Sequence, residues 1–379
     1  MEASRRLAPY AAALLLLVDA ALLYLVDVRG PFPAQVMLGT PTAYRNLYIH
    51  VPIAIAGYAT FTVALIFALL YLVRGEARYE RTAHAAIVVG VIYGAATLVT
   101  GSIWAYESWG SAWNWDPRET GIFFMWIAYL VYFVLRSSIK DPDVAPRISM
   151  SYAVAAYSTI PLSFALPYVM ESLHPVISET KAFVGGGLPA VLFPVRMLIV
   201  NVIAILMIFM VRDRVTGAGS RVLRAGSAAL LFIGLLLVGL YVATLTGARG
   251  GLQLTPGATA KFVGTVSEAR LLEGTNETAT LLLKVYTDGR AVEVRYTGEP
   301  PVKPVTFVYR DKETGTTEVR TSLVSHVVLV EGVVGENGIV EAERLEVLNY
   351  WGVPVNILMY ALFVASAVYL ATRPAGRAA

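Results

Sequence analysis

Long apolar stretches with few charges alternate with short polar segments along most of the chain. A helix needs about 20 apolar residues to cross a hydrocarbon core of roughly 30 Å. Eight stretches suit that length, namely residues 8–28, 47–73, 83–105, 120–139, 148–170, 190–211, 222–245 and 354–372. The pattern predicts a mostly α-helical, polytopic membrane protein with about eight transmembrane helices.

The pattern changes over residues 255–350, where short alternating runs replace the long apolar ones. In "RAVEVRYT" (290–297), apolar and charged side chains alternate with the period of two that is typical of strands. Asp288-Gly289 and Asn337-Gly338 favour tight hairpin turns, and Thr314-Gly315 indicates a third turn. Five or more short strands in one segment predict a small all-β barrel or sandwich, and a closed barrel is favoured because it leaves no exposed sheet edge.

The distribution of basic residues predicts how the protein is oriented in the membrane. The chain has 379 residues, of which 56% are hydrophobic and 15% charged, and its net charge of +3 gives no indication of nucleic-acid binding. Basic residues in short loops stay on the cytoplasmic side, and here they fall in alternate loops: Arg5, Arg6, Arg74, Arg78, Arg81, Arg136, Lys140, Arg147, Arg212, Arg214, Arg221, Arg373 and Arg377. We therefore expect both termini in the cytoplasm and segments 29–46, 106–119, 171–189 and 246–353 outside the plasma membrane.

The loop "WGSAWNWDPRET" (109–120) carries Trp109, Trp113 and Trp115, half of the six tryptophans. Tryptophans at an outer membrane interface commonly form an aromatic belt. Flat indole rings also suit one face of a porphyrin. Asp116 is interpreted either as the N-cap of the following helix, with Pro117 in its first position, or as a residue that contacts a ligand.

Two of the four histidines lie at the outer mouths of apolar spans, at the depth of the tryptophan loop. A neutral imidazole is a good ligand for heme iron, and His50 and His174 would bind it from opposite faces. Arg45, Arg118 and Arg196 lie at the same depth, where guanidinium groups would pair with heme propionates. The alternative is that both histidines are hydrated side chains at span ends. The chain has no cysteine, which excludes disulfides and thiolate metal sites.

Three further polar residues have structural interpretations. His84 is expected to be a hydrated side chain at an inner span end, and His326 a surface or core residue of a strand. Asp19 lies within the first span. It is interpreted as a polar residue facing other helices, with a functional carboxylate as the alternative.

The stretch "GSIWAYESWGSAWNWDPRET" (101–120) resembles the tryptophan-rich WWD signature of the heme-handling superfamily of cytochrome c maturation, which includes CcmC, CcmF and CcsA. The frame around residues 35–212, with "YIHVP" and "SLHP", is most similar to CcmC. The loop reading "AWNWDPRET", with Ala112, is more similar to CcsA. The resemblance implies that His50 and His174 are axial ligands of a b-type heme. It also implies that Trp109, Trp113, Trp115 and Asp116 form an external heme platform.

Residues 225–350 resemble CcmE, an OB-fold heme chaperone that receives heme from CcmC. In that family a histidine or cysteine that attaches heme precedes a tyrosine, and Tyr350 in "EVLNYWGVP" is similar to that tyrosine. No histidine or cysteine occurs in the few residues before Tyr350. Covalent capture by the family route is therefore not expected, which leaves non-covalent docking or a role for His326. The segment "EPPVKPVTFVYRDKETGTTEVRTS" interrupts the usual barrel as an insertion.

The expected organisation is a six-span CcmC-like domain (1–212, with the WWD loop at 106–120), an anchor helix and linker (213–254), an external OB-like barrel (255–350) and a C-terminal transmembrane helix (351–379). The expected function is heme delivery rather than an enzymatic reaction. Its partners would be heme, apocytochrome c or a downstream heme lyase, and an ABC-type ATPase. The alternatives are a CcsA-type heme lyase, a bis-histidine electron carrier, and a scaffold or transporter without heme.

Overall fold

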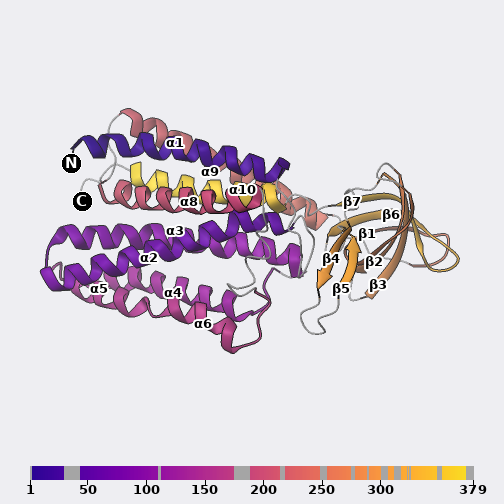
Figure 1. Ribbon diagram of the computed structural model, residues 1–379, viewed down its shortest axis with the longest axis horizontal. Coiled ribbons are helices and arrows are strands. Elements are labelled where there is room, and N and C mark those ends of the chain that lie inside the picture. The colour runs from indigo at the N-terminus through magenta and orange to yellow at the C-terminus, as the bar shows by residue number, and fades with distance from the viewer. Residues whose placement is uncertain are drawn as a thin grey trace.

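The structure is a computed structural model that describes most of the chain: residues 2–29, 43–109, 112–174, 188–213, 218–247, 254–274, 278–287, 290–299, 306–310, 317–321, 323, 326–347 and 352–372. It consists of a long helical bundle and a separate β-barrel beyond one end of the bundle (Figure 1). The chain enters and leaves the barrel through two neighbouring helices.

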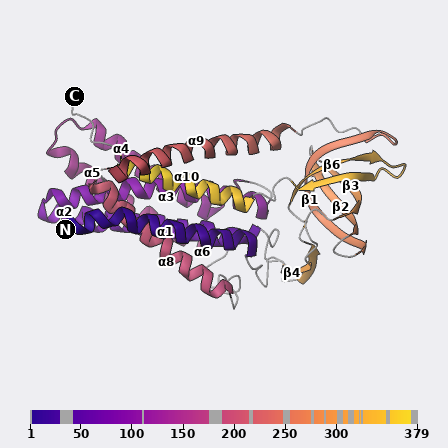
Figure 2. The same ribbon diagram turned by 90° about the horizontal axis from the view of Figure 1, so that it is seen from above.

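The bundle is built from antiparallel helices that run along its length (Figures 1 and 2). They are α1 (Glu2–Arg29), the 3-10 turn η1 (Ala43–Asn46), α2 (Leu47–Arg74), α3 (Ala77–Trp109), α4 (Pro117–Ser138), α5 (Val144–Ala156), α6 (Thr159–Val169), α8 (Leu188–Asp213), α9 (Ala218–Gly247) and α10 (Gly352–Thr372). Each predicted apolar span falls on one of these helices or, for 148–170, on the pair α5 and α6.

Five of the helices are long and apolar enough to cross a membrane, as judged on the described residues alone: α2, α3, α4, α8 and α10. The apolar parts described in α1 and α9, Tyr10–Leu25 and Arg224–Leu237, are shorter. A mostly helical membrane protein with a separate barrel is thus confirmed. The number of eight spans remains a prediction.

The predicted span 148–170 is broken rather than continuous. Pro161 has no N–H group, so the carbonyl of Tyr157 cannot accept the usual helical hydrogen bond from it. The Ser158 N–H donates to the Ala155 carbonyl at 3.1 Å, and the Ile160 N–H donates to the Tyr157 carbonyl at 3.0 Å. These tighter bonds end α5 at Ala156 and start α6 at Thr159.

The C-terminal helix α10 lies inside the bundle rather than beside it (Figure 1). Asn356 on α10 is fully buried, and its amide donates to Asn46 Oδ1 at 2.8 Å and to the Thr100 carbonyl at 3.2 Å. A buried amide donor requires acceptors of this kind. Helix α10, which follows the barrel, is therefore anchored to the start of α2 and to the C-terminal part of α3.

The barrel is closed and has five strands in the order β1-β2-β3-β7-β6. These are β1 (Thr259–Gly274), β2 (Ala279–Thr287), β3 (Arg290–Gly298), β6 (Val327–Val334) and β7 (Val340–Val347). Only β3 and β7 pair in parallel among the described strands. Leu281, Leu283 and Val285 of β2 are buried and the positions between them are less so, which is the predicted alternation.

The predicted hairpins are also present. Strands β2 and β3 pair across residues 288–289, and β6 and β7 pair across a turn in which Gly338 has φ +78°. Within the insertion, β4 (Thr306–Arg310) and β5 (Thr317–Thr321) form a separate two-stranded sheet around the third predicted turn. The insertion therefore adds a hairpin without entering the barrel.

The barrel marks one end of the bundle. Helices α2, α4, α8 and α10 begin at this end, while α1 begins and α10 finishes at the opposite end (Figures 1 and 2). His50, Asp116 and His174, which are far apart in the sequence, all belong to chain segments at the barrel end. This arrangement provides the geometry for the site described next.

Candidate functional site

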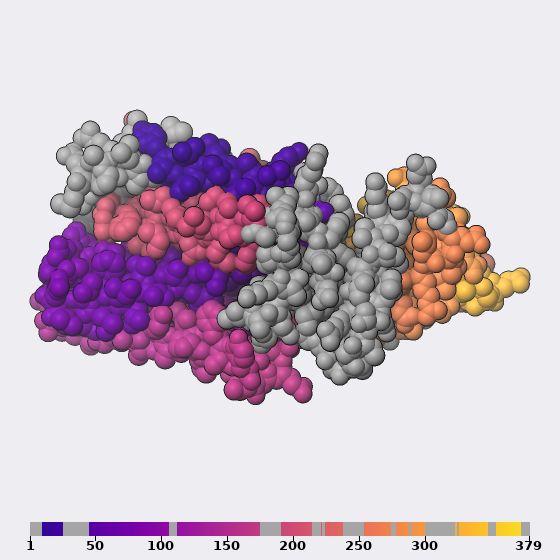
Figure 3. All heavy atoms as spheres, viewed as in Figure 1, coloured from indigo at the N-terminus to yellow at the C-terminus, as the bar shows by residue number. Residues whose placement is uncertain are grey.

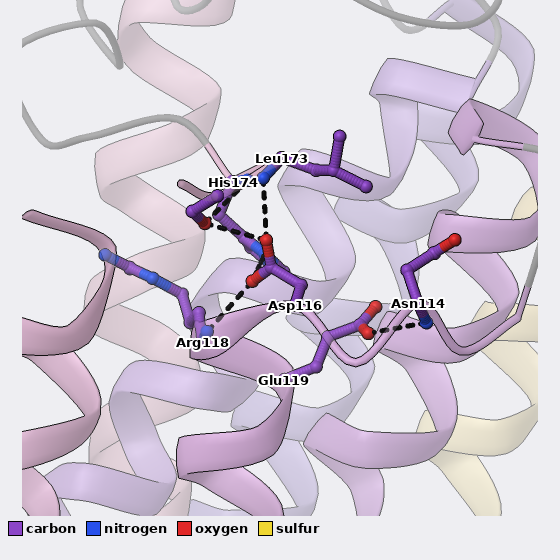
Figure 4. Close-up of polar contacts among 7 residues, drawn as sticks. Asn114, Asp116, Arg118, Glu119, Leu173 and His174 are labelled. Carbon is purple, nitrogen blue, oxygen red and sulfur yellow. Dashed lines mark hydrogen bonds and ion pairs between the residues drawn. The ribbon is translucent and has the colours of Figure 1, made fainter. Parts of the chain in front are cut away.

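The tryptophan loop ends in a tightly held helix start. Asp116 caps α4: its Oδ1 accepts the Arg118 N–H at 2.9 Å, and its carbonyl accepts the Thr120 N–H at 2.9 Å. Pro117 occupies the first helical position, where its missing N–H group is not needed. Glu119 accepts the Asn114 N–H at 3.0 Å and so fastens the loop to the same turn (Figure 4).

Asp116 also holds the segment that carries His174. Its Oδ1 accepts His174 Nδ1–H at 2.7 Å, while Oδ2 accepts the Ser172 hydroxyl at 2.8 Å and the Leu173 N–H at 2.6 Å (Figure 4). The N-cap interpretation of Asp116 is thus confirmed, and the same carboxylate is also the partner of His174. The other ring nitrogen of His174, Nε2, is left as the atom with a lone pair.

These contacts lower the pKa of the Asp116 carboxyl. Burial by itself would raise the pKa of the Asp116 carboxyl. The hydrogen bond and electrostatic attraction of the His174 ring, together with the bonds from Ser172 and the Arg118 N–H, outweigh burial and hold this pKa well below its ordinary value. The carboxylate is therefore charged wherever the histidine is in place.

His50 is held in the same manner from a different helix. It lies in the first turns of α2, and its Nδ1 is 3.0 Å from the Thr100 hydroxyl of α3. That hydroxyl already donates to the Ala96 carbonyl at 2.8 Å, so it accepts from His50 Nδ1–H. The tautomer with Nδ1–H leaves the His50 Nε2 lone pair for a ligand. A histidine that binds a metal typically makes such an outer hydrogen bond with its second nitrogen.

The position of His50 depends on a glycine. A Cβ atom on Gly101 would lie 2.8 Å from His50 Cε1, closer than real Cβ contacts. Gly101 thus allows the imidazole to lie close to the backbone of α3, with Cε1 nearest to it. The ring of Trp104, one turn further along α3, stands edge-on to His50 with centroids 5.7 Å apart.

His50 and His174 face one cavity. It is lined by both histidines and by Thr97, Gly101, Trp113 and Glu119, among others, and its volume is about 30 Å³. Ligand pockets typically start at about 300 Å³. The cavity in this structure is far smaller than that, so a macrocycle held between the two rings would extend well beyond it.

Of the three tryptophans in the predicted platform, Trp113 lines the cavity. Trp113 stands edge-on to Trp115, with centroids 5.8 Å apart, and to Phe123, with centroids 5.7 Å apart. The Trp115 side chain is 71% exposed, and its φ of +55° is rare for a non-glycine residue. Trp109 ends α3, and its side chain lies outside the described residues.

The three predicted arginines are not equivalent. Arg118, half-buried, has its Cζ 5.6 Å from the Phe164 ring, and among the described residues neither Nε nor Nη2 has a hydrogen-bond acceptor. A half-buried cation with two buried nitrogens that lack acceptors suits an anionic ligand. Arg45 is half-buried in η1, just ahead of α2.

Arg196 requires a correction. It is fully buried in α8, and its Nε and Nη2 donate to the two oxygens of Asp19 at 2.9 and 3.0 Å. Its guanidinium is therefore bonded to Asp19 inside the bundle and does not face a propionate at the surface. In this pair Asp19 of α1 faces another helix, α8, as interpreted from the sequence.

The other predicted residues lie away from this site. His84 is half-buried, with Nδ1 2.9 Å from the Tyr132 hydroxyl, so it is packed against rings rather than simply hydrated. His326 is a core residue of the barrel, 1% exposed. Tyr350 lies outside the described residues.

Several site residues were missed from the sequence. Thr100 and Gly101 belong to the quoted stretch before the loop, and Ser172 stands two residues before His174. A small polar residue in an apolar helix was the available signal for Thr100. No spacing rule indicates which of two histidines it faces.

Comparison with known proteins covers the first half of the chain. Residues 6–174 match the model of the family described as Cytochrome C assembly protein. "Heme exporter protein C" of Rhodobacter capsulatus is 31% identical over 151 residues, 39% of this chain and 60% of the relative. The protein of the same name from Paracoccus denitrificans is 28% identical over 150 residues, 38% of this chain and 62% of the relative.

Relatives with a second name match a shorter part of this chain. "Cytochrome c biogenesis protein CcsA" of Calycanthus floridus is 35% identical over 74 residues, 20% of this chain and 23% of the relative. The chain spans about 60% of the length of the first relatives named above. The family match ends at His174, ahead of α8 and the barrel.

Proposed function

We propose, on the premise that residues 6–174 form a cytochrome c assembly domain, that this protein binds heme at the barrel end of the bundle and presents it for cytochrome c maturation. One observation carries the proposal. His50 and His174 come from distant segments, line one cavity, and both have Nδ1 engaged in a hydrogen bond. Nε2 of each ring is then the atom that binds iron.

Heme is the cargo in this proposal, as a b-type iron porphyrin. His50 and His174 are its axial ligands, and Trp113 and Trp115, with Trp109, cover its apolar face. Arg118 pairs with a propionate, supported by its unpaired buried nitrogens, and Arg45 is the candidate for the second. Asp116, the fourth residue of the predicted platform, orients His174.

The barrel is proposed to receive heme from this platform. Its strand order, in which the parallel pairing of β3 with β7 closes the barrel, supports an OB-like fold. The tether between β7 and α10 is short, from Val347 to Gly352, which keeps donor and acceptor at high effective concentration. Because His326 is buried, non-covalent docking is proposed rather than attachment at His326.

The setting proposed is the plasma membrane, crossed several times, with both termini in the cytoplasm and the barrel outside. The five long apolar helices support a membrane location. The partners proposed are apocytochrome c or a downstream heme lyase, with an ABC-type ATPase as a further partner.

The optical spectrum of the purified full chain tests the proposal. We expect a Soret band of low-spin heme with two nitrogen ligands, and loss of this band when His50 and His174 are both replaced by alanine. His84→Ala is the matched control, because His84 is also hydrogen-bonded but lies at the other end of α3. A band of unchanged intensity in the double variant contradicts the proposal.

A second candidate function is heme lyase activity of the CcsA type, favoured by the loop sequence and by the CcsA relatives. In this case the protein would join heme to the cysteines of a Cys-x-x-Cys-His segment in apocytochrome c. Incubating the heme-loaded protein with reduced apocytochrome c separates the two candidates. Thioether-linked product favours the lyase, and unmodified apocytochrome favours delivery alone.

A further inference from the structure

A proline two residues after His50 leaves a gap in the hydrogen bonding of α2. Pro52 has no N–H group, so the carbonyl of Tyr48, four residues earlier, receives no helical hydrogen bond. The proline ring also crowds that carbonyl and turns it away from the helix axis. Tyr48 is buried, and a buried carbonyl without a donor is destabilising.

Arg196 of α8 supplies the missing donor. Its Nη1 donates to the Tyr48 carbonyl, while Nε and Nη2 are held by the carboxylate of Asp19 on α1. Helices α1 and α8 lie side by side on one face of the bundle (Figure 3). The planar guanidinium with several fixed donors suits such a three-way contact, which a lysine ammonium on a flexible stem does not reproduce.

We propose that Arg196, oriented by Asp19, is a positioning residue for His50. The proposal rests on heme ligation by His50. The carbonyl that Arg196 holds belongs to the helical turn that carries His50. The His50 ring packs closely against two consecutive residues of α3, with Nδ1 bonded to the Thr100 hydroxyl and Cε1 near Gly101. Without this donor, the turn would shift to find another partner for the Tyr48 carbonyl, and the imidazole would move with it.

The experiment removes the arginine without leaving a buried charge. Asp19→Asn together with Arg196→Gln deletes both charges, because Arg196→Gln alone would leave an unpaired carboxylate in the bundle. Hemin is titrated into the purified full chain in detergent, and the Soret absorbance and the low-spin fraction are measured. We expect the heme affinity to fall on the order of tenfold, as for other outer-shell contacts of metal ligands, and the low-spin fraction to fall with it.

A third substitution tests the physical cause. Pro52→Ala returns an N–H group to α2 and gives the Tyr48 carbonyl a partner within the helix. We expect Pro52→Ala added to the double variant to restore the affinity and the low-spin spectrum, and Pro52→Ala alone to change neither. Failure of this rescue overturns the proposal. If the double variant does not fold, Arg196→Lys replaces it, with the same rescue expected.

The matched control is a second ion pair at the opposite end of the bundle. Arg136 Nη2 lies 2.5 Å from Glu80 Oε1, and Glu80 is also buried. Glu80→Gln with Arg136→Gln should lower thermal stability but leave heme affinity unchanged. An equal loss of affinity in this control would mean that Arg196 acts only through general stability, and the proposal would be overturned.

The histidine variants separate this inference from the proposed function. If His50→Ala retains the low-spin spectrum, heme ligation by His50 fails, and the positioning role fails with it. If His50→Ala loses the spectrum while the Asp19→Asn, Arg196→Gln variant keeps it, only the positioning role is wrong.

Discussion

Nδ1 of His174 lies 2.7 Å from Oδ1 of Asp116, although the two residues are 58 positions apart. Asp116 is also the N-cap of α4, so the start of one helix fixes the orientation of a histidine that follows another. Asp116 thereby links the tryptophan loop to His174, and a substitution of Asp116 affects both.

Asp116→Asn separates the two roles of this residue. Asparagine is as good an N-cap as aspartate, but it lacks the charge that holds Nδ1–H of His174. We expect heme affinity to fall about 10- to 100-fold, as for other outer-shell partners of metal ligands, measured by hemin titration. Asp143→Asn, at the N-cap of α5 without a side-chain bond, is the control. Equal affinities for wild type and Asp116→Asn would contradict the orienting role.

The lowered pKa of Asp116 predicts a loss of stability in acid. Because the folded state favours the charged carboxylate, its contribution is complete above the ordinary pKa of about 3.9 and is lost as the pH falls below that value toward the folded pKa. The thermal midpoints of wild type and Asp116→Asn should therefore differ at neutral pH, and the difference should shrink progressively as the pH falls below about 4. A gap that is the same at neutral and at acid pH would rule out this linkage.

Gly101→Ala is expected to displace His50. The added Cβ would lie 2.8 Å from Cε1 of the imidazole, and overpacking of this kind costs about 1–3 kcal/mol. Both the thermal midpoint and the Soret band at limiting heme should decrease. Gly226→Ala in α9 is the matched helical control, because open space surrounds that position. Full heme binding by Gly101→Ala would show that the contact does not position His50.

Trp115 combines a strained backbone with an exposed indole, and substitutions separate the two. Trp115→Ala and Trp115→Gly both remove the ring and should weaken heme binding equally. Because φ is +55°, glycine relieves a strain of about 1–2 kcal/mol that alanine keeps. The glycine variant should therefore be the more stable of the two in thermal unfolding. A more stable alanine variant would mean that the backbone is not strained there.

Local patterns in the sequence determined the elements well. The apolar spans correspond to helices because a long apolar run can satisfy its backbone only internally, and the alternating runs of residues 255–350 contain the strands of the barrel. The cap at Asp116-Pro117 was also predictable, since capping depends on neighbouring residues. The break at Ser158 was missed, although Pro161 was visible, because a proline inside an apolar span either kinks or interrupts a helix.

By itself, the sequence determined the helices, the strands, the capped loop and the candidate histidines, because each of these depends on residues within a few positions of one another. Only the tertiary structure decided the partners. Asp19 pairs with Arg196 across 177 positions, His50 with Thr100 across 50, and Asn46 with Asn356 across 310. Such pairs form because a buried polar group must find a partner wherever packing brings one close. Packing is a property of the whole bundle and not of any local pattern.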